Sequence, residues 1–549
     1  MSDFLPTVLL DSFAGGTFGT SWRFSGYLRT LATSKPSEVT GVLREVEDAA
    51  AGGLFAAGFI AYEAASALNP DLPSLAQLDG LPLVWFALFR ERYSVDAGSG
   101  LSSPTRNEVI LEPLINRDNY YRDICQIQDH IAEGHCYQIN HTFQMKGYFK
   151  KDPVELYHSI GRGQRAPFCS YLDTGRFAIL SASPELFFSL KDGVITTRPM
   201  KGTARRGRWA EEDRSAIEHL QNSPKERAEN LMIVDLLRND LGIVAKTGSV
   251  IVDALFEVES YPTVHQMTST VTARVSPDTG LVDIFRALFP CGSVTGAPKR
   301  RSMQIIEKLE GEPRGVYCGA IGLVSPGGEA LFSVAIRTLL LDQESAKISL
   351  GVGSGVTWDS AAEQEYLECL DKGAFVNRIE DDFRLIESLR LEEGVYTLLN
   401  RHLARMEASA KYFGFVFDRK PVQKALAAHA QKLPGLHKTR LLLSSDGGVE
   451  IFSEPLTDYN SAPLRIAVSD DRVDSPDILR YHKTTCREFF DKARSRHPEC
   501  DELLFINERG ELTEGSYHNL VVKLDGRILT PPLTCGLLPG VLREELLEK

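Results

Sequence analysis

The sequence predicts a protein of more than one domain in which strands and helices are mixed. At 549 residues the chain is too long for a single hydrophobic core, and two to four domains are expected. Strand-like and helical patterns alternate along the chain, and the pattern resets around residues 378–382, where acidic residues separate two periodic segments. We therefore expect one domain over residues 1–378 and another over residues 382–549.

Composition and charge exclude several classes of function. The net charge of −13 and the pI near 5.5 disfavour nucleic acid and anionic membranes as partners, so an anionic substrate needs a local site. The nine cysteines are scattered and form no Cys-x-x-Cys pair, which is typical of reduced thiols. The N-terminus has no signal-peptide pattern, and the apolar stretch at 49–68 is interpreted as core helix and strand. We expect a cytoplasmic protein.

A lysine stands out at residues 197–205. The alternating segment 186–196, broken by Asp192-Gly193, predicts a hairpin, so Lys201 lies where a strand enters a glycine-containing loop. A desolvated lysine among other cations favours the neutral amine, a usable nucleophile near neutral pH. Its nearest cations in sequence are Arg198, Arg205 and Arg206. The alternative is a loop lysine in a basic surface patch.

Two predicted helices each carry a pair of glutamates. Residues 224–240 form an amphipathic pattern, with Ser223 as N-cap, Pro224 in the first position and Gly242 at the end. Glu226 and Glu229 share a face of this helix, and Glu365 and Glu368 share a face of a second one that opens at residue 363. Such residues are usually only solvated. Together with an anion-binding site they suggest a hard cation, and Mg²⁺ fits best.

Candidate anion-binding groups lie between these helices. The Gly/Ser/Thr loop at 291–299 feeds a helix at 300–309 and offers free backbone N–H groups, although it lacks the P-loop spacing. Residues 315–322 and 332–338 are predicted core strands, and Arg337 in the second is a candidate carboxylate clamp. Glycines at 351, 353 and 355 allow close approach of the backbone.

The histidines carry less information. His135, Cys136 and His141 resemble a metal-ligand set, but a strand places the two histidines on one face and Cys136 on the other, which favours a structural role. His265 lies in a mostly apolar segment, where a core histidine is commoner than a catalytic one.

Residues 1–377 resemble the chorismate-utilising enzymes. The similarity is carried by motifs at 183–185, 198–203, 225–240, 292–299, 315–322, 336–338 and 365–372. It implies an α+β fold of two packed antiparallel sheets with helices outside, and an active site in a cleft between the sheets. It also implies that Glu229 and Glu368 hold Mg²⁺, which binds the ring carboxylate of chorismate. Residues implied to lie at or near the pyruvyl carboxylate are Tyr317, Arg337, Gly353, Ser293, Thr295, His265 and Lys372.

Two positions discriminate within that family. By resemblance, a lysine in Pro-Met-Lys-Gly-Thr marks enzymes that aminate chorismate at C4, whereas those forming anthranilate or isochorismate carry alanine. Lys201 could add to C2 and expel the C4 hydroxyl before ammonia enters at C4. Gln138 stands where isochorismate-forming relatives have a water-activating lysine, and an amide cannot serve as that base. Amination at C2, as in anthranilate synthesis, is the nearest alternative.

Ammonia is expected from outside the chain. The sequence contains no Gly-x-Cys-x-Gly elbow with a His-x-Glu downstream of it, so the source is a separate glutamine amidotransferase subunit or ammonia in solution.

The C-terminal part resembles the fold class IV pyridoxal-phosphate family. A strand-like segment at 383–390, a helix at 399–413 and motifs at 481–485, 512–520 and 538–543 carry the similarity. It implies that Lys483 binds pyridoxal phosphate and moves the proton, and that Glu514 pairs with the pyridine nitrogen. It further implies that Arg405 and the backbone N–H groups of Val541 and Leu542 hold the phosphate.

The pairing of the two parts favours a lyase over a transaminase. The first domain would make the substrate of the second, which would eliminate pyruvate to leave p-aminobenzoate, a precursor in folate biosynthesis. The usual Asp-Gly-x-Phe entry is missing, and the chain ends six residues after Arg543, so we expect this domain to be incomplete. The alternative is a non-catalytic docking or dimerisation module, and a homodimer through this domain is possible on either interpretation.

Overall fold

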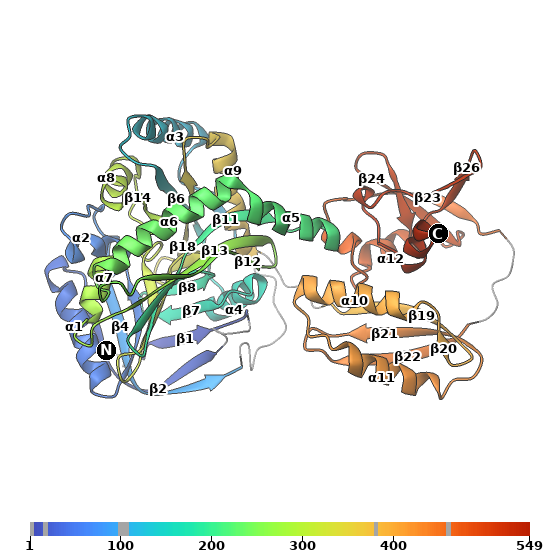
Figure 1. Ribbon diagram of the computed structural model, residues 1–549, viewed down its shortest axis with the longest axis horizontal. Coiled ribbons are helices and arrows are strands. Elements are labelled where there is room, and N and C mark those ends of the chain that lie inside the picture. Colours follow the sequence, from blue (N-terminus) through green and yellow to red (C-terminus); the bar gives the residue numbers. More distant parts are fainter. Residues whose placement is uncertain (1–4, 15–19, 97–108, 378–382, 457–462) are drawn as a thin grey trace. The chain divides into compact units, whose positions relative to one another are not determined.

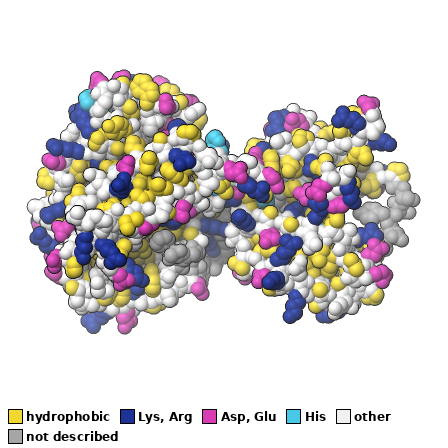
Figure 2. Space-filling view, viewed as in Figure 1, with side chains coloured by type: hydrophobic (Ala, Val, Ile, Leu, Met, Phe, Trp, Pro, Cys, Tyr) yellow, Lys and Arg dark blue, Asp and Glu magenta, His cyan; other side chains and the backbone are white. Residues whose placement is uncertain are grey.

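The computed structural model describes residues 5–14, 20–96, 109–377, 383–456 and 463–549. They divide into an N-terminal unit, Met1–Arg205 with Ile217–Glu380, and a C-terminal unit, Arg206–Ala216 with Asp381–Lys549 (Figure 1). Among the residues described, no helix combines the length and apolarity needed to cross a membrane. Acidic and basic side chains are interspersed over the visible surface of both units (Figure 2).

All strand pairings of the N-terminal unit are antiparallel, and they form two sheets joined at one strand. β1 (Thr7–Asp11) pairs with β7 along its length and with β2 at Leu9 and Leu10 only, which links the sheets into one network. In order of pairing, the first sheet contains β7 (Phe168–Asp173), β8 (Phe177–Ser183), β17 (Thr338–Asp342), β18 (Lys347–Val356) and β6 (Gln138–Tyr148), with β5 (Leu111–Pro113) and β14 (Gly296–Ala297) on β6.

The second sheet continues from β2 to the strand that carries Lys201. Its members in order of pairing are β2 (Ser21–Thr33), β4 (Val84–Val95), β3 (Phe55–Ile60), β15 (Ala320–Val324), β16 (Ala330–Val334), β9 (Leu186–Lys191), β10 (Val194–Arg198) and β13 (Val264–Arg274), with β11 (Met200–Arg205) and β12 (Ile251–Ser260) on β13. The predicted pair of antiparallel sheets is therefore confirmed, with the added link through β1.

Three hydrophobic cores hold these layers together. The core between the sheets joins Ile179 of β8 to Phe59 and Trp85 of the second sheet. The helices covering the outer face of the second sheet are α1 (Val39–Ala51), α2 (Ala65–Leu68) and α7 (Leu281–Leu288), and those covering the first are α3 (Arg117–Ala132), α4 (Pro153–Gln164), α8 (Lys299–Leu309) and α9 (Ala362–Gly373). The N-terminal unit is thus an α/β/β/α sandwich, stabilised by burial of apolar surface on three levels.

Most local predictions are confirmed. The hairpin is formed by β9 and β10, and α6 (Pro224–Gly242) begins after Ser223, whose Oγ accepts a hydrogen bond from the Glu226 amide. The extents of two predicted core strands are wrong. Residues 315–319 form a turn before β15, and Arg337 follows the end of β16 with φ +50° instead of lying within a strand. This left-handed backbone separates β16, which pairs with β15 and β9 in the second sheet, from β17, which pairs with β8 and β18 in the first.

The C-terminal unit contains two larger sheets and a hairpin. One antiparallel sheet comprises β19 (Leu385–Glu392), β20 (Val395–Tyr396), β21 (Leu436–Leu443) and β22 (Val449–Pro455), and α10 (Leu399–Phe413) and α11 (Arg419–Ala430) share its core. The other comprises β23 (Ile466–Val473), β24 (Glu502–Asn507) and β25 (Leu512–Gly515), packed with α12 (Glu488–Ser495). β26 (Val522–Leu524) pairs with β27 (Arg527–Leu529), and α13 (Val541–Glu548) follows.

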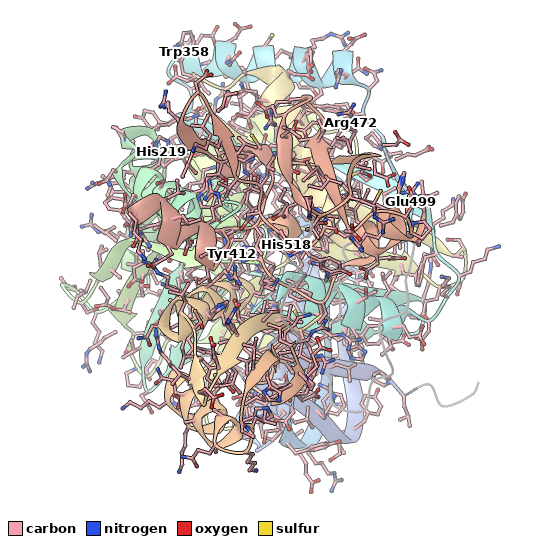
Figure 3. The ribbon with its side chains drawn as sticks, turned by 90° about the vertical axis from the view of Figure 1, so that its right-hand side faces the viewer. His219, Trp358, Tyr412, Arg472, Glu499 and His518 are labelled. Atoms are coloured by element: carbon pink, nitrogen blue, oxygen red, sulfur yellow. The ribbon has the colours of Figure 1, made fainter. Side chains whose placement is uncertain are left out.

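Residues 206–216 pack with the C-terminal unit although they follow β11 directly. This segment includes the start of α5 (Ala210–Asn222). The Trp209 ring lies 5.1 Å from the Tyr481 ring, and the Arg206 guanidinium lies 4.0 Å from the centre of the Tyr412 ring, which is labelled in Figure 3. The segment after the Lys201 strand therefore contacts the residues that precede Lys483.

Candidate active sites

The N-terminal unit contains a cavity of about 230 Å³ lined by residues from both sheets and from α6 and α9. Eight predicted site residues line it: Lys201, Glu229, Ser293, Tyr317, Arg337, Gly353, Glu368 and Lys372. Two others lie outside the lining. The Thr295 hydroxyl donates to the Cys291 carbonyl at 3.1 Å, and His265 Nδ1 lies 2.9 Å from Ser260 Oγ.

Hydrogen bonds to the backbone hold Lys201 at this cavity. Asn230 Nδ2 donates to the Lys201 carbonyl at 3.1 Å, and Gln266 Nε2 donates to the Gly202 carbonyl at 2.9 Å. Gly202 adopts φ +99°, a conformation that favours glycine. Lys201 Nζ then lies 3.7 Å from Glu229 Oε2, with only 16% of the lysine side chain exposed.

The charged groups around Lys201 differ from those expected. Arg205 pairs with Asp371 at 2.7 Å, Arg206 pairs with Asp213 at 2.8 Å, and Arg198 pairs with Glu259. The ammonium of Lys201 therefore faces carboxylates rather than the three arginines. Nearness in sequence did not place these cations at the lysine, because each arginine pairs with a carboxylate of its own, Asp371, Asp213 or Glu259.

The glycines of β18 make room for the side chains of the cavity. A Cβ atom at Gly355 would lie 2.1 Å from both Lys201 Nζ and Gln138 Nε2, and one at Gly351 would lie 2.1 Å from the Tyr317 ring. A Cβ atom at Gly353 would lie 2.6 Å from Thr142 Cγ2. Alternate residues of a strand share a face, so this glycine pattern creates one wall of the site.

Glu185 is a site residue that the sequence analysis did not single out. It lines the cavity and it is buried. Burial raises its pKa to about 7, although the nearby Ser293 hydroxyl, the Met200 amide and the charge of Lys201 oppose the rise. Its position in the Ser183-Pro184-Glu185 motif was the available signal, but the pKa depends on burial that the sequence does not show.

Four glutamates from α6 and α9 line the same cavity: Glu226, Glu229, Glu365 and Glu368. Burial and repulsion by Glu229 raise the pKa of Glu226, and Glu368 contributes to the same effect. Lys372 Nζ lies 2.7 Å from Glu368 Oε1 and donates to the Gly353 carbonyl at 2.9 Å. Carboxylates gathered in this way suit a hard cation such as Mg²⁺, which prefers one or two carboxylates with water and substrate oxygens.

In the C-terminal unit, Lys483 and Glu514 line a small cavity of about 40 Å³. Burial, followed by the charge of Arg405, lowers the pKa of Lys483 to about 8. Burial raises the pKa of Glu514 to about 8, and its carboxylate accepts hydrogen bonds from Leu538 N and Asn519 Nδ2 at 3.1 and 3.0 Å. A buried amine that is readily neutral, together with a buried acid, fits the chemistry of pyridoxal phosphate.

The predicted phosphate-binding residues lie outside the lining of this cavity. Arg405 forms two hydrogen bonds to Glu387, at 2.8 and 2.6 Å, and Nη1 donates to the Pro539 carbonyl at 3.0 Å. Val541 and Leu542 form the first turn of α13, with Val541 buried and Leu542 exposed. His518, labelled in Figure 3, follows Glu514 closely in the sequence, but it pairs with Glu502 at 2.5 Å.

Comparison with known proteins shows which families the two parts of the chain match. Residues 8–378 match the chorismate binding enzymes. The chain belongs to the chorismate-binding enzyme family. Residues 384–549 match the class IV amino-transferases. The predicted resemblance of both parts is therefore confirmed.

Relatives of this chorismate-binding enzyme carry two names. Aminodeoxychorismate synthase component 1 of Klebsiella aerogenes is 44% identical over 265 residues, 48% of this chain and 58% of that protein. Anthranilate synthase component 1 of Saccharolobus solfataricus is 32% identical over 388 residues, 67% of this chain and 91% of that protein. Anthranilate synthase component I of Streptococcus pneumoniae TIGR4 has the same fold, with a TM-score of 0.57 at 24% identity over 69% of this chain and 93% of that one. The match thus spans little more than half of the Klebsiella protein.

Proposed function

We propose that the N-terminal unit aminates chorismate at C4 to give 4-amino-4-deoxychorismate. The observation that carries the proposal is the position of Lys201 Nζ inside the cavity, 3.7 Å from Glu229 Oε2, with Gln138 rather than a lysine beside it. An amine in this place is a nucleophile, whereas the glutamine amide cannot activate water. The relatives named aminodeoxychorismate synthase agree with this assignment.

Chorismate has two carboxylates, and the cavity offers two places for them. In this proposal Arg337, Tyr317, the backbone at Gly353 and Lys372 take the pyruvyl carboxylate, with Ser293 nearby and with Thr295 and His265 supporting the surrounding backbone. Glu229 and Glu368 would hold Mg²⁺, which supplies positive charge for the ring carboxylate. Both glutamates line the cavity from different helices, and Glu226 and Glu365 lie beside them.

Lys201 would act as a covalent catalyst. Its neutral amine forms a bond to C2, both ring double bonds shift, and the C4–O bond breaks as the hydroxyl leaves with a proton. Ammonia then bonds to C4, both double bonds return to their places, and the C2–N bond to Lys201 breaks. Glu185, whose pKa is raised to about 7 by burial, can exchange the protons that these steps require. A glutamine amidotransferase subunit would supply the ammonia.

The C-terminal unit would convert the product to p-aminobenzoate with loss of pyruvate. Bound pyridoxal phosphate supplies an electron sink for this elimination. Lys483 would hold the cofactor and take the proton from C4 of the substrate, because its pKa near 8 leaves much of the amine neutral. Glu514 would face the pyridine nitrogen, and Arg405 with the backbone of Val541 and Leu542 would face the phosphate.

Product analysis tests both parts. Chorismate, Mg²⁺ and ammonium should give aminodeoxychorismate without pyridoxal phosphate and p-aminobenzoate with it. Lys201→Ala should lose both products, Lys483→Ala should lose only the second, and Lys191→Ala, which removes an exposed lysine of the hairpin, should retain both. Peptide mass spectrometry should find the substrate adduct on Lys201.

Two outcomes would overturn parts of the proposal. Anthranilate as the product would favour the function named for the Saccharolobus relative. Aminodeoxychorismate that accumulates despite pyridoxal phosphate, without cofactor absorbance, would leave the C-terminal unit as a docking or dimerisation module, for which the mass in solution gives an independent measurement.

A further inference from the structure

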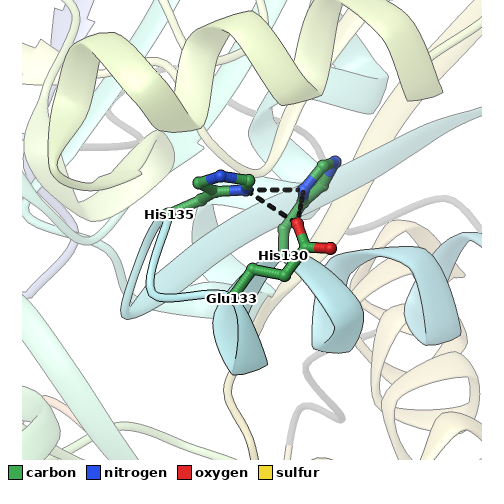
Figure 4. A group of neighbouring side chains, drawn as sticks. All are labelled: His130, Glu133 and His135. Atoms are coloured by element: carbon green, nitrogen blue, oxygen red, sulfur yellow. Dashed lines mark hydrogen bonds and ion pairs between the residues drawn. The ribbon is translucent and has the colours of Figure 1, made fainter.

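Two histidines and a glutamate converge at the end of α3, away from the residues that line either cavity. His130 Nδ1 and His135 Nδ1 are 3.1 Å apart (Figure 4). Glu133 Oε2 lies 3.1 Å from His135 Nδ1 and 3.7 Å from His130 Nδ1. Of the residues that the structure describes, these are the three histidine, cysteine or acidic side chains whose ligand atoms gather within 4.8 Å of one another.

The backbone explains why these side chains meet. The His135 amide donates to the His130 carbonyl at 3.0 Å, the Gly134 amide donates to the Ile131 carbonyl at 2.9 Å, and Gly134 has φ +74°. This is a Schellman motif, which brings the side chain of the third-last helical residue against that of the second residue after the C-cap. Apolar side chains usually fill these two positions. Here both are imidazoles, and the C-cap residue Glu133 adds a carboxylate.

The distances suit coordination of one ion. Two nitrogens bound at about 2.0–2.1 Å to a tetrahedral zinc ion lie about 3.3 Å apart. The observed separations of 3.1, 3.1 and 3.7 Å bracket that value. A hydrogen bond between the two Nδ1 atoms needs a proton on one of them, and a cation bound to both would take the place of that proton.

We propose that His130, Glu133 and His135 form a binding site for a divalent transition metal, with Zn²⁺ the best fit. Imidazole ligands select zinc over Mg²⁺, which prefers oxygen donors, so this site is distinct from the glutamates of α6 and α9. The three side chains are 32%, 61% and 39% exposed in sequence order, which leaves access for the ion and for water as a further ligand.

A bound ion would tie the end of α3 to the start of β6. The Tyr137 amide bonds to the Ala297 carbonyl at 2.8 Å, and β6 then begins at Gln138, whose side chain lies beside Lys201 at the position of Gly355. The role that follows is structural, because the metal does not touch the cavity. This inference does not depend on the chemistry proposed for Lys201.

Equilibrium dialysis of the full chain against Zn²⁺, in excess Mg²⁺, tests the site. The double variant His130→Asn/His135→Asn should bind one zinc equivalent fewer than the wild type, and zinc should raise the midpoint of thermal unfolding of the wild type more than that of the variant. His219→Asn, which alters an exposed histidine of α5, is the matched control and should bind as the wild type does. Equal stoichiometry in all three proteins would overturn the proposal.

A second variant tests the site independently if the double variant misfolds. Glu133→Gln changes an exposed side chain and should weaken binding at this site about tenfold or more. Displacement of the zinc by Mg²⁺ would place the ion at carboxylates instead and would also overturn the assignment.

Discussion

Lys201 Nζ lies 3.7 Å from Glu229 Oε2, so the proposed nucleophile is paired with a proposed magnesium ligand. Lys372 and Glu368 form a second such pair at 2.7 Å. In each pair a lysine ammonium occupies the neighbourhood where the divalent cation is expected. Binding of the cation would weaken the electrostatic attraction between Glu229 and Lys201, because the carboxylate would interact with two positive charges.

Removal of the Lys201 charge should therefore strengthen Mg²⁺ binding. We expect Lys201→Ala to bind Mg²⁺ about fivefold more tightly, equivalent to about 1 kcal/mol, although it is inactive. Titration calorimetry in the absence of chorismate measures the difference. Lys191→Ala should show no change, and an unchanged affinity in Lys201→Ala would mean that Glu229 does not bind the ion.

Substitution of Gly355 should displace Lys201 without unfolding the protein. In Gly355→Ala the new methyl group would meet Lys201 Nζ and Gln138 Nε2, the far ends of two flexible side chains. We expect the rate of chorismate amination to fall about 100-fold, since displacement by about 1 Å costs that much in a preorganised site. Gly311→Ala, which meets nothing within 4 Å, is the control. A normal rate in Gly355→Ala would show that Lys201 can react from another position.

Glu185 should make the stability of the N-terminal unit depend on pH. Burial raises its pKa from 4.5 to about 7, so the folded state favours the protonated acid. The stabilising contribution is complete below pH 4.5 and is lost as the pH rises through 7. The unfolding free energy of Glu185→Gln minus that of the wild type should therefore increase by about 3 kcal/mol from pH 4.5 to pH 8.

Denaturant unfolding at the two pH values measures this gain. Glu329→Gln, at an exposed turn, should follow the wild type at both. Equal pH dependence in wild type and Glu185→Gln would contradict the raised pKa.

Trp209 should stabilise the Lys483 site. Its ring packs against Tyr481, which lies two residues before Lys483. The Tyr481 hydroxyl accepts a hydrogen bond from Arg208 at 3.2 Å. Trp209→Ala should destabilise the C-terminal unit by about 2 kcal/mol and reduce incorporation of pyridoxal phosphate, with chorismate amination retained. Cofactor absorbance and thermal unfolding measure these effects. Trp358→Ala, at a 60% exposed residue of the N-terminal unit, should leave both unchanged.

The local predictions succeeded where neighbouring residues in the sequence decide the structure. The Ser223 cap and the 3.6-residue period place Glu226 and Glu229 on α6, and the glycines of β18 share a face because a strand has a period of two. Neither result requires knowledge of distant residues. The position of Arg337 was predicted less well, because its left-handed backbone depends on the strands that flank it.

The sequence by itself determined the resemblance of both parts to known families, the helices that carry the glutamates and the hairpin that leads to Lys201. Only the tertiary structure decided which groups face one another. It places Glu229 rather than the arginines beside Lys201, buries Glu185, assigns residues 206–216 to the C-terminal unit and gives His135 a partner in His130 rather than His141. The physical reason is that pKa values and ligand geometry arise from burial and from contacts across the fold, whereas helices, strands and caps arise from adjacent residues.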